Sequence, residues 1–111
     1  MKRNVSSTFF KKEELELIRT TRKAMRAADH PLRQNIMSLL RKTKQTTVTD
    51  IYSKLRLEQS VASQHLAILR QAGLVSTKRD GREIYYSVNE DAVKHLLETC
   101  ASLELQALTR A

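Results

Sequence analysis

The stretch that decides the fold covers residues 57–88, LEQSVASQHLAILRQAGLVSTKRDGREIYYSV. In its first half the apolar residues Ala62, Leu66 and Leu69 follow helical spacing, and Gly73 stands where a left-handed helix cap is expected. After Gly73 the period changes from that of a helix to that of a strand, and Asp80-Gly81 is a strong hairpin-turn signal. The stretch therefore predicts a helix over about 59–72, followed by a β-hairpin.

A two-residue turn at Asp80-Gly81 also predicts the register of the hairpin. It places the basic residues of both strands close to the tip, where they form a basic wing. Four pairs would then face each other across the strands, one of them of opposite charge: Arg79 with Arg82, Lys78 with Glu83, Thr77 with Ile84, and Val75 with Tyr86.

A short helix is expected just before residue 57. Thr47 is a good N-cap, and about three residues separate the predicted helix from the one that begins near Gln59. Two short helices so close together, the second amphipathic, are typical of a helix-turn-helix. The apolar residues of the first helix recur at i, i+3, i+4 and i+7 and are Val48, Ile51, Tyr52 and Leu55.

Further helices are expected on both sides of this unit. One covers residues 11–28 and another covers residues 90–108. Between the first of these and the helix-turn-helix, a helix opens with Asp29 as its cap and Pro31 in its first turn. The predicted fold is mainly α with a β-hairpin wing, a winged helix-turn-helix with additional N- and C-terminal helices.

Composition limits the classes to which the protein can belong. The chain has 111 residues and a formal net charge of +8, and residues 30–88 hold ten basic and four acidic residues. That excess favours a polyanion such as nucleic acid as partner. The single cysteine excludes an intramolecular disulfide and fits a reducing compartment, and no apolar run approaches the roughly 18 residues of a membrane span. We expect a soluble, cytoplasmic domain over residues 11–111, preceded by a flexible arm over residues 1–10, with no membrane partner.

These motifs resemble the ArsR/SmtB family of small bacterial transcriptional repressors. The family pattern has Ser, a polar residue and His-Leu in its recognition helix, then Ala-Gly-Leu-Val, a basic wing with a glycine at its tip, and an aromatic strand. The resemblance implies a winged-helix repressor that dimerises through its terminal helices. Glu58 departs from the pattern, which often has Ser or a similar cap there. The matching residues are Ser63, Gln64, His65-Leu66, Ala72-Gly73-Leu74-Val75, Gly81 and Tyr85-Tyr86, together with Asp29 to Arg33 at the start of the second helix.

The recognition helix and the wing are the predicted contacts to double-stranded DNA. One helix face is polar but uncharged, which suits base edges in a major groove, and the basic wing can reach phosphates or a neighbouring minor groove. His65 is expected to be a partly buried packing residue. The predicted DNA-binding residues are Gln59, Ser60, Ser63, Gln64, Lys78, Arg79 and Arg82, with Arg41, Lys42, Lys44, Lys54 and Arg56 as candidates for further phosphate contacts.

The first and last helices are the predicted dimer interface, in line with the resemblance. Both carry apolar stripes that a small core alone would not fully cover. The predicted interface residues are Leu15, Ile18, Met25, Leu96, Cys100 and Leu103.

No metal, cofactor or catalytic site is expected, and no small-molecule ligand can be identified from the sequence. The resemblance implies two kinds of metal site, and neither is complete. Residues 48–55 lack Cys-x-Cys, and Asp91, His95 and Glu98 do not have the required spacing. A redox switch at Cys100 would need a second copy of the chain. No phosphate loop or nucleophile motif is recognisable, so an enzyme is not expected.

The sequence thus predicts a repressor that binds a palindromic operator as a homodimer, through the 59–72 helix and the 78–83 wing. Three alternatives stay open: a winged-helix protein-interaction module, a binder of double-stranded RNA, and a metal- or redox-responsive repressor of the same family. The uncharged polar helix face and the basic wing favour DNA over the first alternative. Competition between DNA and RNA duplexes distinguishes the second.

Overall fold

The computed structural model describes residues 9–110, with side chains as far as Gln106. Residues 1–8 of the predicted arm lie outside this range. Within it no helix is long and apolar enough to cross a membrane. The elements follow in the order α1 (Lys12–Ala28), α2 (Pro31–Thr43), β1 (Thr46–Thr47), α3 (Val48–Leu55), α4 (Gln59–Gln71), β2 (Val75–Asp80), β3 (Glu83–Val88) and α5 (Glu90–Arg110).

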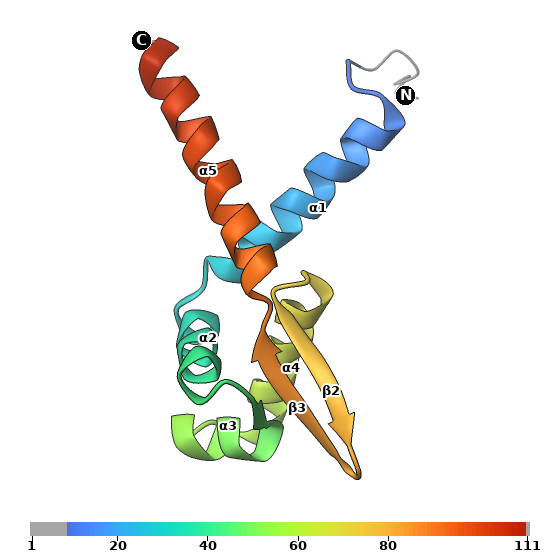
Figure 1. The fold of residues 1–111 in the computed structure, drawn as a ribbon, viewed down its shortest axis with the longest axis vertical. Coiled ribbons are helices and arrows are strands. Elements are labelled where there is room, and N and C mark those ends of the chain that lie inside the picture. Colours follow the sequence, from blue (N-terminus) through green and yellow to red (C-terminus); the bar gives the residue numbers. More distant parts are fainter. Residues whose placement is uncertain (1–8, 111) are drawn as a thin grey trace, which may run out of the picture.

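Helices α1 and α5 diverge from a common base, and the other elements form a body below them (Figure 1). Ala27 of α1 and Leu96 of α5 are buried at this base, with 2% and 9% of their surface exposed. Both belong to the core of the body. The other large side chains of that core come from α2, α3, α4 and the residues after α4, and the fully buried ones are Ile36, Leu40, Ile51, Leu66, Leu69 and Leu74.

The hairpin is part of an antiparallel sheet in the order β1-β3-β2. β1 is a strand that the sequence analysis did not predict. Thr46 and Thr47 pair with Tyr86 and Tyr85 of β3, and Thr46 is 6% exposed. A strand of two residues is too short to show a period. Backbone pairing through β1 ties the start of α3 to the base of the wing.

The predicted hairpin register is wrong. The two turn residues are Gly81 and Arg82 rather than Asp80 and Gly81. Gly81 has a φ of +66° whereas Arg82 is not in the left-handed region, and glycine at the first position of a two-residue loop is the type II′ pattern. The observed pairs are Asp80 with Glu83, Arg79 with Ile84, Lys78 with Tyr85, Thr77 with Tyr86, and Val75 with Val88.

The observed register keeps each hairpin side chain on its predicted face, but it does not form the predicted pair of opposite charge. Each residue of β2 meets a partner two positions further along β3 than predicted, and an even displacement keeps every side chain on its face. Lys78 faces Tyr85 and not Glu83. Lys78 therefore has no cross-strand carboxylate, contrary to the prediction.

One predicted helix cap is confirmed and another is wrong. The Thr47 hydroxyl caps α3 as expected. α2 is capped by His30, whose Nδ1 accepts the Leu32 N–H at 3.1 Å, whereas Asp29 ends α1. Because Pro31 is the first helical residue, the cap falls on the residue just before it. The predicted winged helix-turn-helix, with an additional helix at each end, is confirmed.

Candidate nucleic-acid interface

Helix α4 has one buried face and one exposed face, as helical spacing predicts. Its buried residues are Ala62, Leu66 and Leu69. Glu58 at the N-cap makes no side-chain capping hydrogen bond, as expected for a poor N-cap. Burial of one face against the core leaves the other face free to enter a groove of nucleic acid. The residues that the sequence predicts as contacts on this helix all lie exposed, and they are Gln59, Ser60, Ser63 and Gln64.

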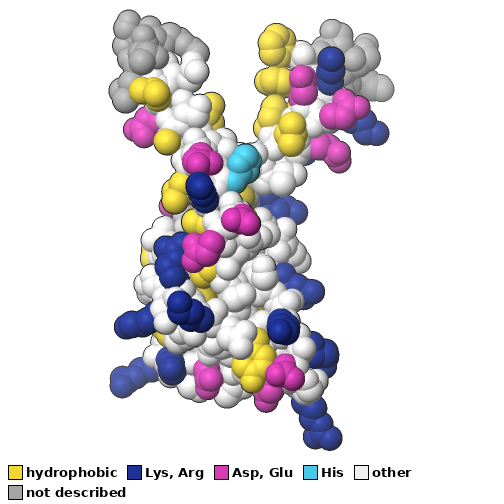
Figure 2. Space-filling model, in the orientation of Figure 1, with side chains coloured by type: hydrophobic (Ala, Val, Ile, Leu, Met, Phe, Trp, Pro, Cys, Tyr) yellow, Lys and Arg dark blue, Asp and Glu magenta, His cyan; other side chains and the backbone are white. Residues whose placement is uncertain are grey.

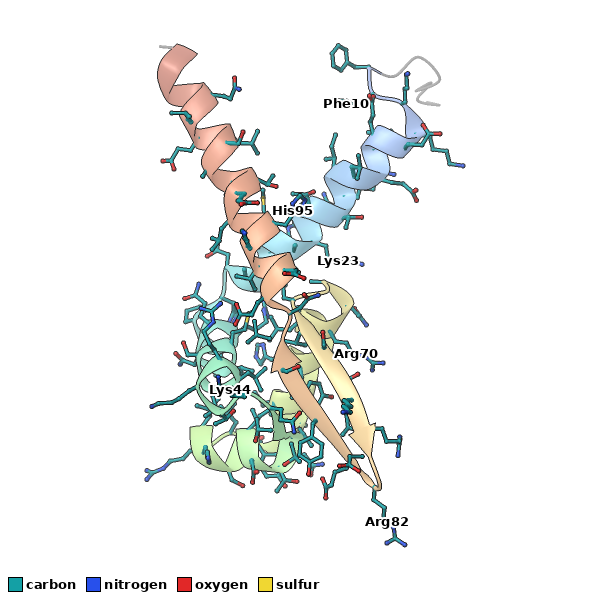
Figure 3. All side chains as sticks on the ribbon, viewed as in Figure 1. Phe10, Lys23, Lys44, Arg70, Arg82 and His95 are labelled. Atoms are coloured by element: carbon teal, nitrogen blue, oxygen red, sulfur yellow. The ribbon has the colours of Figure 1, made fainter. Side chains whose placement is uncertain are left out.

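The three predicted wing cations are exposed but face different directions. Lys78 and Arg79 are neighbours in β2, so their side chains leave opposite faces of the hairpin. Arg82 is a turn residue and projects from the tip of the wing (Figure 3). Among the described residues none of the three forms an ion pair. Each therefore keeps its charge available for a polyanion.

Arg33, in the first turn of α2, holds α4 from its inner side. Its Nε donates to the Ala27 carbonyl at 2.7 Å and its Nη2 to the Arg26 carbonyl at 3.2 Å, while Nη1 lies 3.1 Å from Nδ1 of His65. A guanidinium only donates, so Nδ1 of His65 is the acceptor. Burial, followed by the charges of His30 and Arg33, lowers the pKa of His65. His65 is thus a partly buried packing residue, as predicted.

The candidates for further phosphate contacts are exposed, but one of them is already paired. Arg41 donates from Nε and Nη2 to the Glu90 carboxylate at 2.9 and 2.6 Å. This hydrogen bonding raises the pKa of Arg41 and lowers that of Glu90. Arg41 therefore joins α2 to α5 and is less available to DNA. In Figure 2 Lys and Arg side chains lie along both edges of the lower body; the other exposed candidates are Lys42, Lys44, Lys54 and Arg56.

Apolar side chains line a cleft of about 460 Å³ between α1 and α5. Leu17, Ile18 and Leu103 are 68%, 44% and 59% exposed there. Three predicted interface residues, Ile18, Met25 and Leu103, thus share one cleft, whose full lining is Leu17, Ile18, Thr21, Arg22, Met25, Thr99 and Leu103.

The remaining predicted interface residues lie differently. Leu96 belongs to the core of its own chain and offers almost no surface to a second copy. Leu15 and Cys100 are half-buried, and Cys100 packs against the same core as a free thiol. The prediction omitted Leu17, which also lines the cleft and is 68% exposed. Leu17 falls beside the stripe that helical spacing selects on α1, so its place in the cleft could be found only from the packing of α1 and α5.

No group of three or more His, Cys, Asp or Glu residues that could hold a metal ion occurs in the described part of the chain. His95 and Glu98 line a shallow cleft on α5 together with Thr99, Ser102 and Leu103. This cleft offers two metal-ligating side chains, which is fewer than a tetrahedral zinc site requires.

The class of the protein is winged helix-turn-helix, because α3 and α4 are followed by the β2–β3 wing. In this protein α4 has an exposed polar face, the wing is basic, and an apolar cleft lies between the terminal helices. Residues 30–77 match the family described as bacterial regulatory protein, arsR family. The fold is similar to that of the homodimeric winged helix-turn-helix DNA-binding domain of a possible ArsR-family transcriptional regulator from Mycobacterium bovis. That similarity has a TM-score of 0.70 and 22% identity, and covers 90% of this chain and 94% of that one.

Two relatives are also similar in sequence. The transcriptional repressor PagR of Bacillus anthracis is 41% identical over 69 residues, which are 62% of this chain and 69% of PagR. The transcriptional activator HlyU of Vibrio cholerae is 39% identical over 61 residues, which are 55% of this chain and 56% of HlyU. The chain belongs to the arsR family of bacterial regulatory proteins. That family consists of transcriptional regulators and not of enzymes, which confirms the predicted class.

Proposed function

We propose that the chain is a transcriptional repressor that binds a roughly palindromic operator as a homodimer, through residues 59–72 and the wing at 78–83. The observation that carries this proposal is the exposed start of α4. Its first six residues, QSVASQ, contain no charged side chain, although exposed helix faces are usually rich in Lys and Glu. Amide and hydroxyl groups on such a face suit base edges, and Gln can bond adenine through two hydrogen bonds.

The dimer is supported by the apolar cleft between α1 and α5. Large exposed apolar residues such as Leu17 and Leu103 line it, and contiguous apolar surface of this kind marks an interaction site. A second copy related by a two-fold axis would cover both clefts at once. The two recognition helices would then address two half-sites, so the operator would share the symmetry of the protein.

Repression is supported by the relative named as a repressor, PagR, whereas HlyU is named an activator. A reporter gene placed behind the bound sequence tests the direction of regulation. Expression of the protein should lower reporter output. A rise in output would show that this chain activates transcription.

Selection of bound sequences from random duplex DNA tests the central part of the proposal. We expect two half-sites with two-fold symmetry, their centres about one helical turn or a multiple apart. With six or more phosphate contacts in the dimer, the log–log slope of affinity against salt should be about −5 or steeper. A flat salt dependence, the absence of any enriched sequence, or equal affinity for an RNA duplex would contradict the proposal.

A further inference from the structure

A second group of cations lies outside the residues predicted to contact DNA. It lines a cleft of about 440 Å³ between the C-terminal half of α1 and helices α2 and α4, which we call the basic cleft. Five of its seven lining residues are cationic and none is acidic. They are Arg19, Arg22, Lys23, Arg26, Ala27, Arg33 and Ile68.

Four of these cations form no ion pair with any residue that the structure describes. Arg33 is committed to the backbone of α1 and to His65. The other four are exposed, and within the described residues none forms an ion pair. They follow one another on α1 at i, i+3, i+4 and i+7, so like charges face each other on successive turns and destabilise the helix. A bound anion would remove this repulsion.

The basic cleft lies beside the recognition face of α4. Gln71 is eleven residues after Ser60, so it shares that face, and it lines a smaller adjoining cleft together with Arg19 and Lys23. In Figure 3 Lys23 and Arg70 project from the same side of the molecule. The recognition face therefore continues into cationic surface at the C-terminal end of α4.

The position of the basic cleft fits the shape of a DNA duplex. An α-helix about 10–12 Å across fills a major groove about 12 Å wide, so a phosphate backbone runs along each side of the helix. A neighbouring side of α1 carries Leu17, Ile18 and Met25 toward α5, and Arg22 lies at the border of the two clefts. One helix can thus serve a second subunit with one face and a phosphate backbone with the other.

We infer that the basic cleft binds phosphate groups of the DNA backbone beside each half-site, at the C-terminal end of α4. This inference rests on the proposed function and adds to it a contact surface on α1. The chemistry recognised is a phosphate ester, which Arg holds through paired N–H groups. A free phosphate compound would offer the same chemistry, so the experiment tests both sources.

The test compares two triple variants that remove the same number of charges. Arg19→Ala, Lys23→Ala and Arg26→Ala together remove three of the four unpaired cations of the basic cleft and keep Arg22. Lys11→Ala, Lys12→Ala and Lys94→Ala remove exposed cations elsewhere. All affected side chains are exposed, and thermal unfolding checks that both variants remain folded. Binding is measured across a salt series with the selected operator and with a random duplex.

We expect the cleft variant to bind both duplexes about tenfold or more weakly at about 100 mM salt, with unchanged sequence preference. Its log–log slope should be shallower than that of the control variant by about two, one contact for each subunit of a dimer. If the two variants have equal slopes and affinities while the wild-type protein still selects its operator, the basic cleft does not bind DNA phosphates. That result would overturn this inference and leave the proposed function intact. Failure of the wild-type protein to select any duplex would overturn both.

A second arm uses inorganic pyrophosphate at constant ionic strength. The inference predicts that pyrophosphate raises the unfolding temperature of the two variants and of the wild-type protein by similar small amounts. If pyrophosphate stabilises the wild-type and control proteins but not the cleft variant, and the DNA slopes are equal, the cleft binds a free phosphate compound. That result would overturn its assignment to DNA.

Discussion

Nη1 of Arg33 lies 3.1 Å from Nδ1 of His65, so the first turn of α2 holds the middle of the recognition helix. The rings of His65 and His30 are also close, with centroids 4.9 Å apart. Arg33 is always charged, so a proton on His65 would place two positive groups in contact and remove the acceptor from the hydrogen bond. The arrangement requires a neutral His65.

We therefore expect acid to weaken the fold through His65. Its pKa in the folded protein is lower than the value of 6.5 that an unperturbed histidine has, so the unfolded chain takes up this proton first. The free energy of unfolding should fall as the pH drops from about 6.5 toward the folded-state pKa of His65. At higher pH His65 is neutral in both states, so it should not make the unfolding free energy depend on pH. Chemical denaturation at a series of pH values between about 5 and 8 measures this fall.

The variant His65→Asn isolates the effect, because Asn keeps a hydrogen-bond acceptor and does not titrate. It should lose part of the decline in unfolding free energy below about pH 6.5. His95→Asn, at an exposed position on α5, is the control and should keep the wild-type profile. Identical profiles for His65→Asn and the wild-type protein would contradict the prediction.

The limits of the sequence-based prediction have a common physical cause. Periodicity reveals which face of a helix is buried, and it placed α3, α4 and the hairpin because one face of each packs on the core. The contact between Arg33 and His65 joins residues 32 positions apart, and β1 exists only through its pairing with β3. Neither leaves a local pattern. The hairpin register depends on where the positive φ of Gly81 falls within the turn, which a single residue decides.

Gln64→Ala should change sequence preference. Gln64 is exposed on the recognition face. Loss of its bidentate pair of hydrogen bonds to a base edge should cost about 1–3 kcal/mol of binding free energy on the preferred operator. Random duplex should be bound almost as well as by the wild-type protein. Titration of both duplexes measures the difference, and an equal loss on the two would contradict a base-reading role.

Arg82→Ala should act differently, because Arg82 at the wing tip is expected to contact phosphate through its charge and not to read a base. Affinity for preferred and random duplexes should fall to a similar extent. The log–log salt slope should become shallower by about one for each removed contact, and thus by about two in a dimer. An unchanged slope would show that Arg82, which projects from the tip, does not contact phosphate.

Leu103→Asp should weaken the proposed dimer. Leu103 lines the apolar cleft and is 59% exposed, so a second copy that covers the cleft would bury the new carboxylate, at a high free-energy cost. Sedimentation should show a dissociation constant raised at least about tenfold, since tenfold corresponds to about 1.4 kcal/mol. Ser102→Asp, beside it on the side of α5 that carries His95 and Glu98, should sediment as the wild-type protein does. Equal association of both variants would rule out this cleft as the interface.

Operator binding should not depend on zinc. His95 and Glu98 share one shallow cleft, and the described residues contain no cluster of three metal-ligating side chains. Added zinc or a chelator should therefore shift operator affinity by no more than about threefold, below the range of allosteric coupling that begins near 1 kcal/mol. Cys100 packs against the core as a free thiol, so Cys100→Ser should bind the operator normally with and without oxidant. If zinc releases the DNA about tenfold or more, and His95→Ala removes that effect, α5 is a metal sensor and the prediction is wrong.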